Sequence, residues 1–269
     1  MIGSLSFIKA CALGNDFVII TDHTLIDPTT LPSLSQKMAD RRWGVGCDQV
    51  IYVYPAGDNG SIHNVRFFNS DGSEAEACGN GSLCVAKLLI QRYNLEKVTL
   101  QTAGGTLDCT LLKDGTVRVV LPKPVCVQTI DLNIFDDFGN PSAVFVDLGN
   151  PHLVCFVNDL SVCEKWGPLL ETYLPKLDPT MPQRVNVGFA TEVDRQTLHL
   201  RVWERGAGFT QACGTGACAA AAAGQALGLI DHDVQVKQQG GVLGVHLGTD
   251  HFLMQGEAQL IYAGSFLAD

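Results

Sequence analysis

The chain has 269 residues, enough for one large domain or two of moderate size. Apolar residues make up 46% of the sequence, so a sizeable core can form and wholesale disorder is excluded. The net charge of −10 argues against a nucleic-acid or anionic-membrane partner, because phosphate contacts require clustered lysine and arginine.

The start of the chain, residues 1–9, lacks the charged segment and the apolar run of a secretory signal. No stretch of the sequence approaches the ~20 apolar residues that would span a bilayer. We therefore expect a cytoplasmic protein without a membrane partner.

In the first half, β-branched or alternating runs between turn residues predict strands, and helically spaced apolar residues predict helices. The predicted strands are 16–21, 49–54, 64–68, 98–102, 106–112 and 117–121. The predicted helices are 34–42 and 79–93. Residues 122–139 contain two prolines and end in glycine, so they either cross to the second half or form an ordinary long connection.

The second half repeats this order of elements. The sequence predicts strands at 143–147 and 153–157, a helix over 162–174 stopped by Pro175, a strand at 198–203, a helix at 217–227 and short strands to the end. Runs of strands interrupted by few helices favour an α+β fold over alternating βαβ units.

The two halves also share sequence. The pattern Ala-Cys-Gly-x-Gly occurs at 77–81 and again 135 positions later at 212–216, and Leu-Gly-Asn occurs at 13–15 and 148–150. The same offset links Arg66 to Arg201 and Asn69 to Glu204, and the Gly-Gly of 104–105 recurs at 240–241. Such ordered self-similarity indicates a duplicated fold.

We therefore expect an α+β protein of two pseudo-symmetric domains. Each domain would be a mixed or antiparallel sheet wrapped around a central helix, with the active site in the cleft between the two. The expected bounds are 1–121, completed by 257–269, for the N-terminal domain and 122–256 for the C-terminal domain.

The sequence contains ten cysteines, for which three explanations compete. A disulfide scaffold is typical of short secreted chains, and a structural zinc site would show Cys-x-x-Cys spacing, which does not occur here. Most cysteines, such as Cys109, Cys126, Cys155 and Cys163, are expected to be inert core thiols and to bind no metal.

Cys78 and Cys213 differ from the rest because each precedes Gly-x-Gly and a helical run. This places the thiol at a helix N-terminus, where unpaired backbone N–H groups favour a thiolate and lower a cysteine pKa. The same N–H groups can hold a substrate carboxylate, since glycine lets the backbone approach a ligand. A thiolate on one face of a carbon and a thiol on the other could invert its configuration.

Two other interpretations compete with a catalytic one for this motif. Gly214, Gly216 and Ala219 match the dinucleotide-binding pattern, but the residues before them do not form a strand leading into the turn. Both cysteines could also be simple core residues at helix starts, although their matched positions in a duplication argue against this.

Several motifs resemble the diaminopimelate epimerase family. Residues 68–81, with Asn69 and Cys78, are similar to its first signature, and residues 204–217, with Glu204, Arg205 and Cys213, are similar to its second. Supporting blocks lie at 13–17, 46–49, 149–152 and 184–189, so the resemblance covers essentially the whole chain.

The resemblance implies an isomerase that needs no pyridoxal phosphate or other cofactor and interconverts LL- and meso-diaminopimelate for lysine and peptidoglycan synthesis. It makes Cys78 and Cys213 the catalytic base and acid, with His152 and Glu204 supporting them. It assigns substrate binding to Asn15, Gln49, Asn69, Gly79, Asn80, Asn150, Asn186, Glu204, Arg205, Gly214 and Thr215. It also implies a homodimer, with Tyr262 at the interface.

The chain departs from the family at Phe209, where many members carry Glu after Gly-Ala-Gly. We expect this change to affect the packing of the loop rather than activity.

Three alternatives remain open. A proline, hydroxyproline or histidine racemase also uses two thiols, but the amides and Arg205 favour a substrate with a distal zwitterion. A phenazine-biosynthesis-type isomerase shares the fold without the cysteine pair. A thiol sensor would join Cys78 and Cys213 reversibly in a disulfide.

Overall fold

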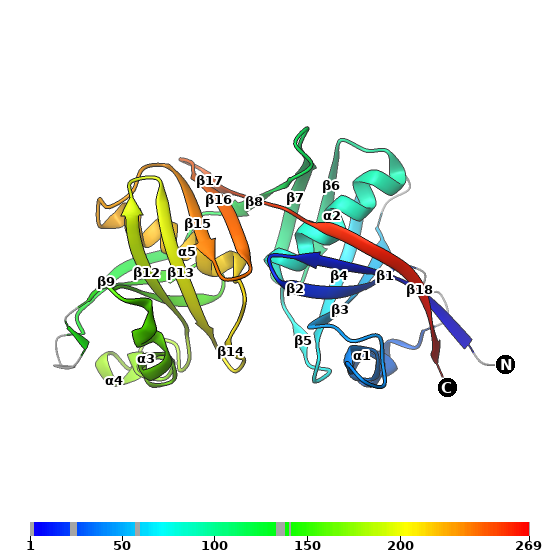
Figure 1. Ribbon diagram of the computed structural model, residues 1–269, viewed down its shortest axis with the longest axis horizontal. Coiled ribbons are helices and arrows are strands. Elements are labelled where there is room, and N and C mark those ends of the chain that lie inside the picture. Colours follow the sequence, from blue (N-terminus) through cyan, green and yellow to red (C-terminus); the bar gives the residue numbers. More distant parts are fainter. Residues whose placement is uncertain (1–2, 22–25, 57–59, 133–137, 140, 269) are drawn as a thin grey trace. The chain divides into compact units, whose positions relative to one another are not determined.

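The computed structural model describes residues 3–21, 26–56, 60–132, 138–139 and 141–268. The chain divides into two compact units (Figure 1). Unit 1 contains Met1–Val120 and Gln255–Asp269, and unit 2 contains Leu121–Met254.

Unit 1 is a mixed sheet around one long helix. Its elements are β1 (Gly3–Ala12), β2 (Asn15–Ile20), η1 (Pro28–Thr30), α1 (Leu31–Ala39), β3 (Gln49–Pro55), β4 (Ile62–Asn69), β5 (Glu74–Ala75), α2 (Gly79–Tyr93), β6 (Lys97–Thr102), β7 (Gly105–Leu111), β8 (Val117–Pro122) and β18 (Gln259–Ala268). The strand order is β18–β1–β2–β3–β4–β6–β7–β8, and only the β2/β3 and β4/β6 pairs of this order are parallel among the described residues.

Unit 2 has the same construction. Its elements are β9 (Cys126–Ile130), β10 (Ser142–Asp147), β11 (Pro151–Phe156), η3 (Leu160–Val162), α3 (Cys163–Leu170), α4 (Leu174–Leu177), β12 (Asn186–Asp194), β13 (Thr197–Glu204), β14 (Gly208–Phe209), α5 (Gly214–Ala226), β15 (Asp233–Gln238), β16 (Gly241–Leu247) and β17 (His251–Gly256). The order is β9–β10–β11–β12–β13–β15–β16, with β11/β12 and β13/β15 parallel.

The duplicated halves of the sequence exchange their last strands. β8 leads into β9, which pairs with β10 in unit 2, whereas β17 leads into β18, which pairs with β1 in unit 1. Each unit is therefore completed by a strand that follows the other half of the sequence.

The central helices are buried for different reasons in the two units. In α2, the helically spaced Leu83, Ala86, Leu89 and Ile90 are almost fully buried. In α5, residues 217–224 are buried on every side, because a run rich in alanine keeps the helix thin and lets strands approach it closely. Both helices pack against strands of their own unit.

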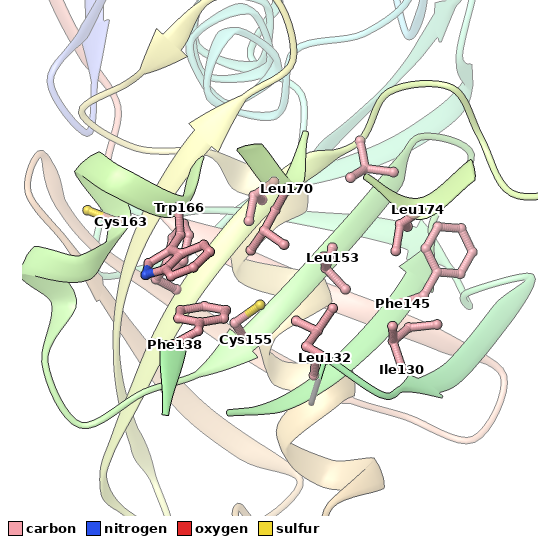
Figure 2. Packing of buried hydrophobic residues seen from close by; sticks show 14 residues of the cluster. Ile130, Leu132, Phe138, Phe145, Leu153, Cys155, Cys163, Trp166, Leu170 and Leu174 are labelled. Atoms are coloured by element: carbon pink, nitrogen blue, oxygen red, sulfur yellow. The ribbon is translucent and has the colours of Figure 1, made fainter. Parts of the chain in front are cut away.

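A second layer covers the other face of the sheet in unit 2. Figure 2 shows Trp166, Leu170 and Leu174 from α3 and α4 packed against side chains of β10 and β11. Phe138 stacks on Trp166 with a centroid separation of 4.6 Å. This cluster covers the face of the sheet opposite to the one on which α5 packs.

Most predicted elements are confirmed, and three predictions are wrong in detail. The helix expected at 217–227 is α5, which begins earlier, at Gly214. The helix expected at 79–93 is α2, and the predicted strands match β2–β4, β6–β8, β10, β11 and β13 to within two residues. The helix expected at 34–42 begins at Leu31, because Pro32 suits a first turn, and it ends at Ala39. The single helix expected at 162–174 is instead two short ones, and Pro175 lies in the first turn of α4 rather than ending a helix.

Candidate functional site

Cys78 and Cys213 cap the two central helices. Each has extended backbone at the N-cap position, and each sulfur accepts a hydrogen bond from the amide three residues later. The distances are 3.4 Å from Gly81 N to Cys78 Sγ and 3.3 Å from Gly216 N to Cys213 Sγ. The expectation that both thiols stand at helix starts is confirmed, and the N–H groups of these first turns favour negative charge at the sulfur.

The second glycine of each motif lies where a side chain would be crowded. A Cβ at Gly216 would lie 3.2 Å from Cys213 Sγ and 3.0 Å from Val202 Cγ2. A Cβ at Gly81 would lie 3.0 Å from Phe67 Cε1 and in ordinary contact, at 3.4 Å, with Cys78 Sγ. Glycine therefore leaves room for the thiol at Gly216 and for the Phe67 ring at Gly81.

Neutral amides extend the site in unit 1. Asn80 Nδ2 donates to Asn15 Oδ1 at 2.8 Å, and Asn15 Nδ2 donates to Asp48 Oδ2 at 3.2 Å. On neighbouring strands, Gln49 Nε2 donates to Asn69 Oδ1 at 2.8 Å. These are the predicted substrate-binding residues of this half, and the fold gathers them into two hydrogen-bonded groups.

An ion cluster anchors the start of β2, where Asn15 lies. Asp16 accepts from Lys9 Nζ at 2.6 Å and from Arg41 at 2.7 Å, while Arg41 also reaches Asp48 at 2.8 Å. Burial by itself would raise the pKa of Asp16, but the hydrogen bonds from Arg41 and Lys9 outweigh it and lower the pKa to about 2. The cluster ties β2 to the start of β3, so it fixes Asn15 beside Asn80.

In unit 2, Thr215 joins three site residues. Its hydroxyl oxygen lies 3.0 Å from Asn150 Nδ2, 3.1 Å from His152 Nε2 and 3.6 Å from Cys213 Sγ. Gln238, which the sequence did not single out, accepts the Cys213 backbone N–H at 2.8 Å through its Oε1.

His152 is fully buried and neutral. Burial and the nearby Arg205 guanidinium lower the pKa of His152 to about 3, so the ring is uncharged at neutral pH. Asn186 stands beside it on the parallel strand, and its Oδ1 accepts the Arg205 backbone N–H at 2.9 Å. Asn186 therefore positions the loop on which Arg205 lies.

Glu204 contacts Cys213 and Thr210. The Thr210 hydroxyl donates to Glu204 Oε1 at 2.5 Å, and the Cys213 thiol forms a hydrogen bond with the same carboxyl group. Burial raises the pKa of Glu204 more than these two hydrogen bonds lower it. A carboxyl group with a raised pKa is suited to sharing a proton with a thiol.

A second buried carboxylate, that of Glu171, supports the loop on which Arg205 lies, although no sequence motif points to it. Glu171 accepts from Trp203 Nε1 at 2.8 Å, from Gly206 N at 3.1 Å and from Arg184 Nε at 2.8 Å. Gly206 has φ +78°, a conformation that favours glycine. Glu171 follows α3 in an ordinary helical context, so only the fold reveals that it holds the 204–208 turn.

The two half-sites are related position by position. Asn15 corresponds to Asn150, and each joins its loop to the residue two positions after the thiol. Phe17 pairs with Gln49 between parallel strands, just as His152 pairs with Asn186. The two half-sites differ at equivalent positions: unit 2 has the polar residues His152, Glu204 and Thr215 where unit 1 has Phe17, Asn69 and Asn80.

Phe209 occupies the position that corresponds to Glu74. In unit 1, Arg66 binds Glu74 through two 2.7 Å hydrogen bonds. In unit 2, the Arg201 guanidinium lies 4.6 Å from the Phe209 ring centroid, and Trp203 meets the same ring edge-on. A cation–π contact thus replaces an ion pair at this place.

Tyr262, metal-binding groups and membrane-spanning helices were the other subjects of prediction. Tyr262 lies half-exposed on β18 and meets Phe7 edge-on at 5.9 Å. Within the described ranges, no group of three or more His, Cys, Asp or Glu could hold a metal ion. No helix among those residues is long and apolar enough to cross a membrane.

Comparison with known proteins identifies the family. The diaminopimelate epimerase family model matches residues 7–127 and 144–261. A diaminopimelate epimerase of Nostoc punctiforme is 37% identical over 97% of this chain and 99% of the relative, and one of Gluconobacter oxydans is 40% identical with the same coverage.

A solved structure extends the likeness to the fold. The hydroxyproline epimerase of Agrobacterium vitis, with bound trans-4-hydroxy-L-proline, has a TM-score of 0.71 at 16% identity, covering 99% of this chain and 93% of that one. At that identity the likeness concerns the fold alone. With its paired helix-capping thiols and the full-length match to the family model, the chain belongs to the diaminopimelate epimerase family.

Proposed function

We propose that the protein is a diaminopimelate epimerase that interconverts LL- and meso-diaminopimelate by moving a proton at one α-carbon, without a cofactor. The observation that carries this proposal is the pair of thiols in equivalent N-cap positions of a duplicated fold. Family membership and the names of the full-length relatives support the choice of substrate.

The proposed reaction uses both thiols on one carbon. One cysteine, as a thiolate, removes the α-proton, and the other, as a thiol, delivers its proton to the opposite face. The roles of Cys78 and Cys213 reverse when the reaction runs backwards, so the pair carries one proton in each resting form.

The helix starts stabilise the charge that develops in this step. Removal of the α-proton places negative charge on the adjacent carboxylate, which needs hydrogen-bond donors already in position. The backbone N–H groups of Gly79, Asn80, Gly214 and Thr215 lie in the first turns of α2 and α5 and meet this need. Since these groups are fixed by the helices, they need no rearrangement during the reaction.

The polar side chains bind the rest of the substrate in this proposal. The distal amino acid group requires neutral acceptors for its ammonium and a planar cation for its carboxylate. We assign these roles to Asn15, Gln49, Asn69, Asn150, Asn186, Glu204 and Arg205. His152 and Glu204 support the thiols, and contact between Glu204 and Cys213 favours this role for the carboxyl group.

Deuterium incorporation tests the function directly. In D₂O with LL-diaminopimelate, reduced protein should introduce deuterium at an α-carbon, which mass spectrometry of the amino acid detects. L-proline, trans-4-hydroxy-L-proline and L-histidine serve as comparison substrates in parallel reactions. Exchange with one of these and none with diaminopimelate would make the protein a different racemase, and no exchange with any would exclude the two-thiol reaction.

We also propose that the protein acts in lysine and peptidoglycan precursor synthesis and works as a homodimer. The pathway follows from the proposed product. The dimer is supported by exposed apolar side chains on β18, which include Ile261 and Tyr262.

A further inference from the structure

The Thr215 hydroxyl is placed to act on the sulfur of Cys213. Its oxygen lies within hydrogen-bond distance of Asn150 Nδ2, His152 Nε2 and Cys213 Sγ, at 3.0, 3.1 and 3.6 Å. A hydroxyl can accept two hydrogen bonds and donate one. The three contacts therefore match the full capacity of this group.

The direction of each hydrogen bond follows from its partners. Asn150 Nδ2 can only donate, so it uses one lone pair of the hydroxyl. His152 is neutral and carries one ring proton, and among the described residues its buried Nδ1 has no hydrogen-bond partner. A proton on Nδ1 would be a buried donor without an acceptor, which costs more than an unused lone pair, so the proton belongs on Nε2.

With this tautomer, His152 donates to Thr215 through Nε2. The hydroxyl then accepts from both Asn150 and His152, and its own proton is left for the remaining neighbour, Cys213 Sγ. The hydrogen bond is strongest when the sulfur is a thiolate, because charge-assisted hydrogen bonds exceed neutral ones.

Unit 1 has no equivalent of this arrangement. Asn80 holds the matching position after Cys78, and its Nδ2 is directed to Asn15 Oδ1 at 2.8 Å. Phe17 replaces His152 in the parallel-strand pair with Gln49. The fold is repeated here, but among the residues that the structure describes the hydroxyl and the imidazole that polarises it occur beside Cys213 and not beside Cys78.

We propose that Thr215 is a positioning residue that donates its hydroxyl proton to the Cys213 thiolate, with Asn150 and His152 fixing the direction of that donation. The proposal rests on the proposed function for its catalytic meaning. No proton leaves Thr215: the hydroxyl stabilises the thiolate form, and the proton taken from the substrate stays on sulfur.

Charged and titratable neighbours of Cys213 in unit 2 stay in place when only the hydroxyl is removed. Glu204 bonds to the thiol itself, His152 lies beyond the Thr215 hydroxyl, and Arg205 acts on His152. Thr215→Val has nearly the same shape as threonine and retains the backbone N–H of the first turn. A change in Cys213 reactivity in this variant is therefore due to the hydroxyl.

Peptide-resolved alkylation without substrate tests the proposal. Wild type, Thr215→Val and Thr215→Ser are treated with iodoacetamide from pH 6 to pH 10, and the modification rate of each cysteine is read by mass spectrometry. We expect Cys213 in Thr215→Val to react about tenfold more slowly at pH 7.5, with its profile moved up by about one pH unit. Thr215→Ser should match wild type.

Controls are contained in the same digest. Cys78 should keep its wild-type rate, and the fully buried Cys155 and Cys218 should stay unmodified unless the variant unfolds. If they react in Thr215→Val, Thr215→Ala takes its place in the same assay. A wild-type rate and profile for Cys213 in a folded variant that lacks the hydroxyl would overturn the proposal.

Turnover supplies a separate result. With LL-diaminopimelate, Thr215→Val should lower kcat while KM stays within about twofold, because the backbone groups that bind carboxylate remain. A raised KM with unchanged kcat would assign the hydroxyl to substrate binding and contradict the proposal. The alkylation assay needs no substrate, so its failure is distinguishable from failure of the proposed function.

Discussion

Backbone hydrogen-bond donors, rather than exposure, separate the two capping thiols from most other cysteines, since Cys213 is itself only 7% exposed. Burial raises the pKa of Cys47, Cys109 and Cys218 to about 12 and raises that of Cys84 and Cys155 well above the ordinary value, so these thiols stay protonated. Cys78 and Cys213 instead accept backbone N–H hydrogen bonds at helix starts. These local N–H donors, which stabilise a thiolate, distinguish the two thiols from the other cysteines.

Replacement of either thiol should stop turnover without unfolding the protein. A serine hydroxyl has nearly the same shape but a far higher pKa, so Cys78→Ser and Cys213→Ser should each lower kcat by about 10²–10⁴-fold. Circular dichroism and thermal unfolding should match wild type. Cys109→Ser is the matched control at a buried thiol outside the site. Wild-type turnover in either active-site variant would contradict the two-thiol mechanism.

His152 should make stability depend on pH. Its folded pKa of about 3 lies below the unfolded value of ~6.5, so only the unfolded chain binds this proton as the pH falls from 6.5 towards 3. The stability that neutral His152 retains above pH 6.5 is lost on acidification, by about 2 kcal/mol between pH 7 and pH 5. His152→Phe, which copies Phe17 of unit 1, should lack this component.

Urea unfolding at pH 7 and pH 5 checks this value. The difference between the two free energies of unfolding is measured for wild type and for His152→Phe, and carboxylates that titrate in both proteins cancel. Equal differences in the two proteins would show that His152 is not kept neutral by burial.

The two catalytic thiols could be predicted from the sequence because both lie in a repeated motif. The residues that hold the thiols and the neighbouring loop in place could not. Glu171 and Gln238 belong to no recognisable sequence motif. Each acts because the fold brings it close to a backbone N–H group far away in the sequence, that of Gly206 or of Cys213. His152 and Glu204 could be named from the family resemblance, but their environments depend on burial, which a sequence does not state.

At the scale of elements, the Cys-Gly-x-Gly start determines where the thiol lies. Gly216→Ala should place a methyl group 3.2 Å from Cys213 Sγ and so displace the sulfur from its N–H donor. We expect kcat to fall by at least about tenfold, since small misplacements of reacting groups are costly. The measurement is initial rate at saturating diaminopimelate.

Gly224→Ala is the matched control within the same helix. Its methyl group meets Ile230 Cγ1 at 3.1 Å, a similarly close contact, but lies about three turns away from the thiol. Turnover should stay near wild type in this variant, whatever its effect on Tm. Equal losses of activity in both variants would assign the effect to general packing in α5.

Helix ends were less predictable than helix positions. α2 could be predicted to the residue because apolar spacing, the glycine-rich start and the αL residue Asn94 after its end all agree. The segment 162–177 was mispredicted because proline usually marks a helix break, whereas Pro168 lies inside α3 and Pro175 lies in the first turn of α4. A single apolar spacing also runs across both short helices. Local signals conflict there, and the packing of Trp166 and Leu170 on the sheet determines the result.

At the scale of the whole molecule, the duplication could be predicted from the sequence, whereas the exchange of the last strands between the two units could not. A fixed offset is visible in motifs, whereas the pairing of β9 with β10 and of β18 with β1 depends on strands far apart in the chain. β1, β9 and β12 were not predicted as strands, and β18 was expected only as one of several short strands near the end, so the closing of each sheet could not be derived. The relation between equivalent residues, however, follows directly from the offset.

The association state is the remaining prediction at this scale. Ile261, Tyr262 and Leu267 on β18 are 52%, 48% and 61% exposed, an apolar set that a partner copy would cover. Light scattering should give twice the chain mass of 28.9 kDa. Tyr262→Glu should move the mass towards that of one chain at low concentration, because a charge in an apolar interface is costly to bury.

Val125→Glu provides the control for this measurement. Val125 is 78% exposed in unit 2, so the same charge is added at an apolar site outside β18 and the mass should stay that of a dimer. A single-chain mass for wild type would refute the dimer. A dimeric Tyr262→Glu variant would remove β18 from the interface, because a carboxylate placed among paired apolar side chains should weaken association by several kcal/mol.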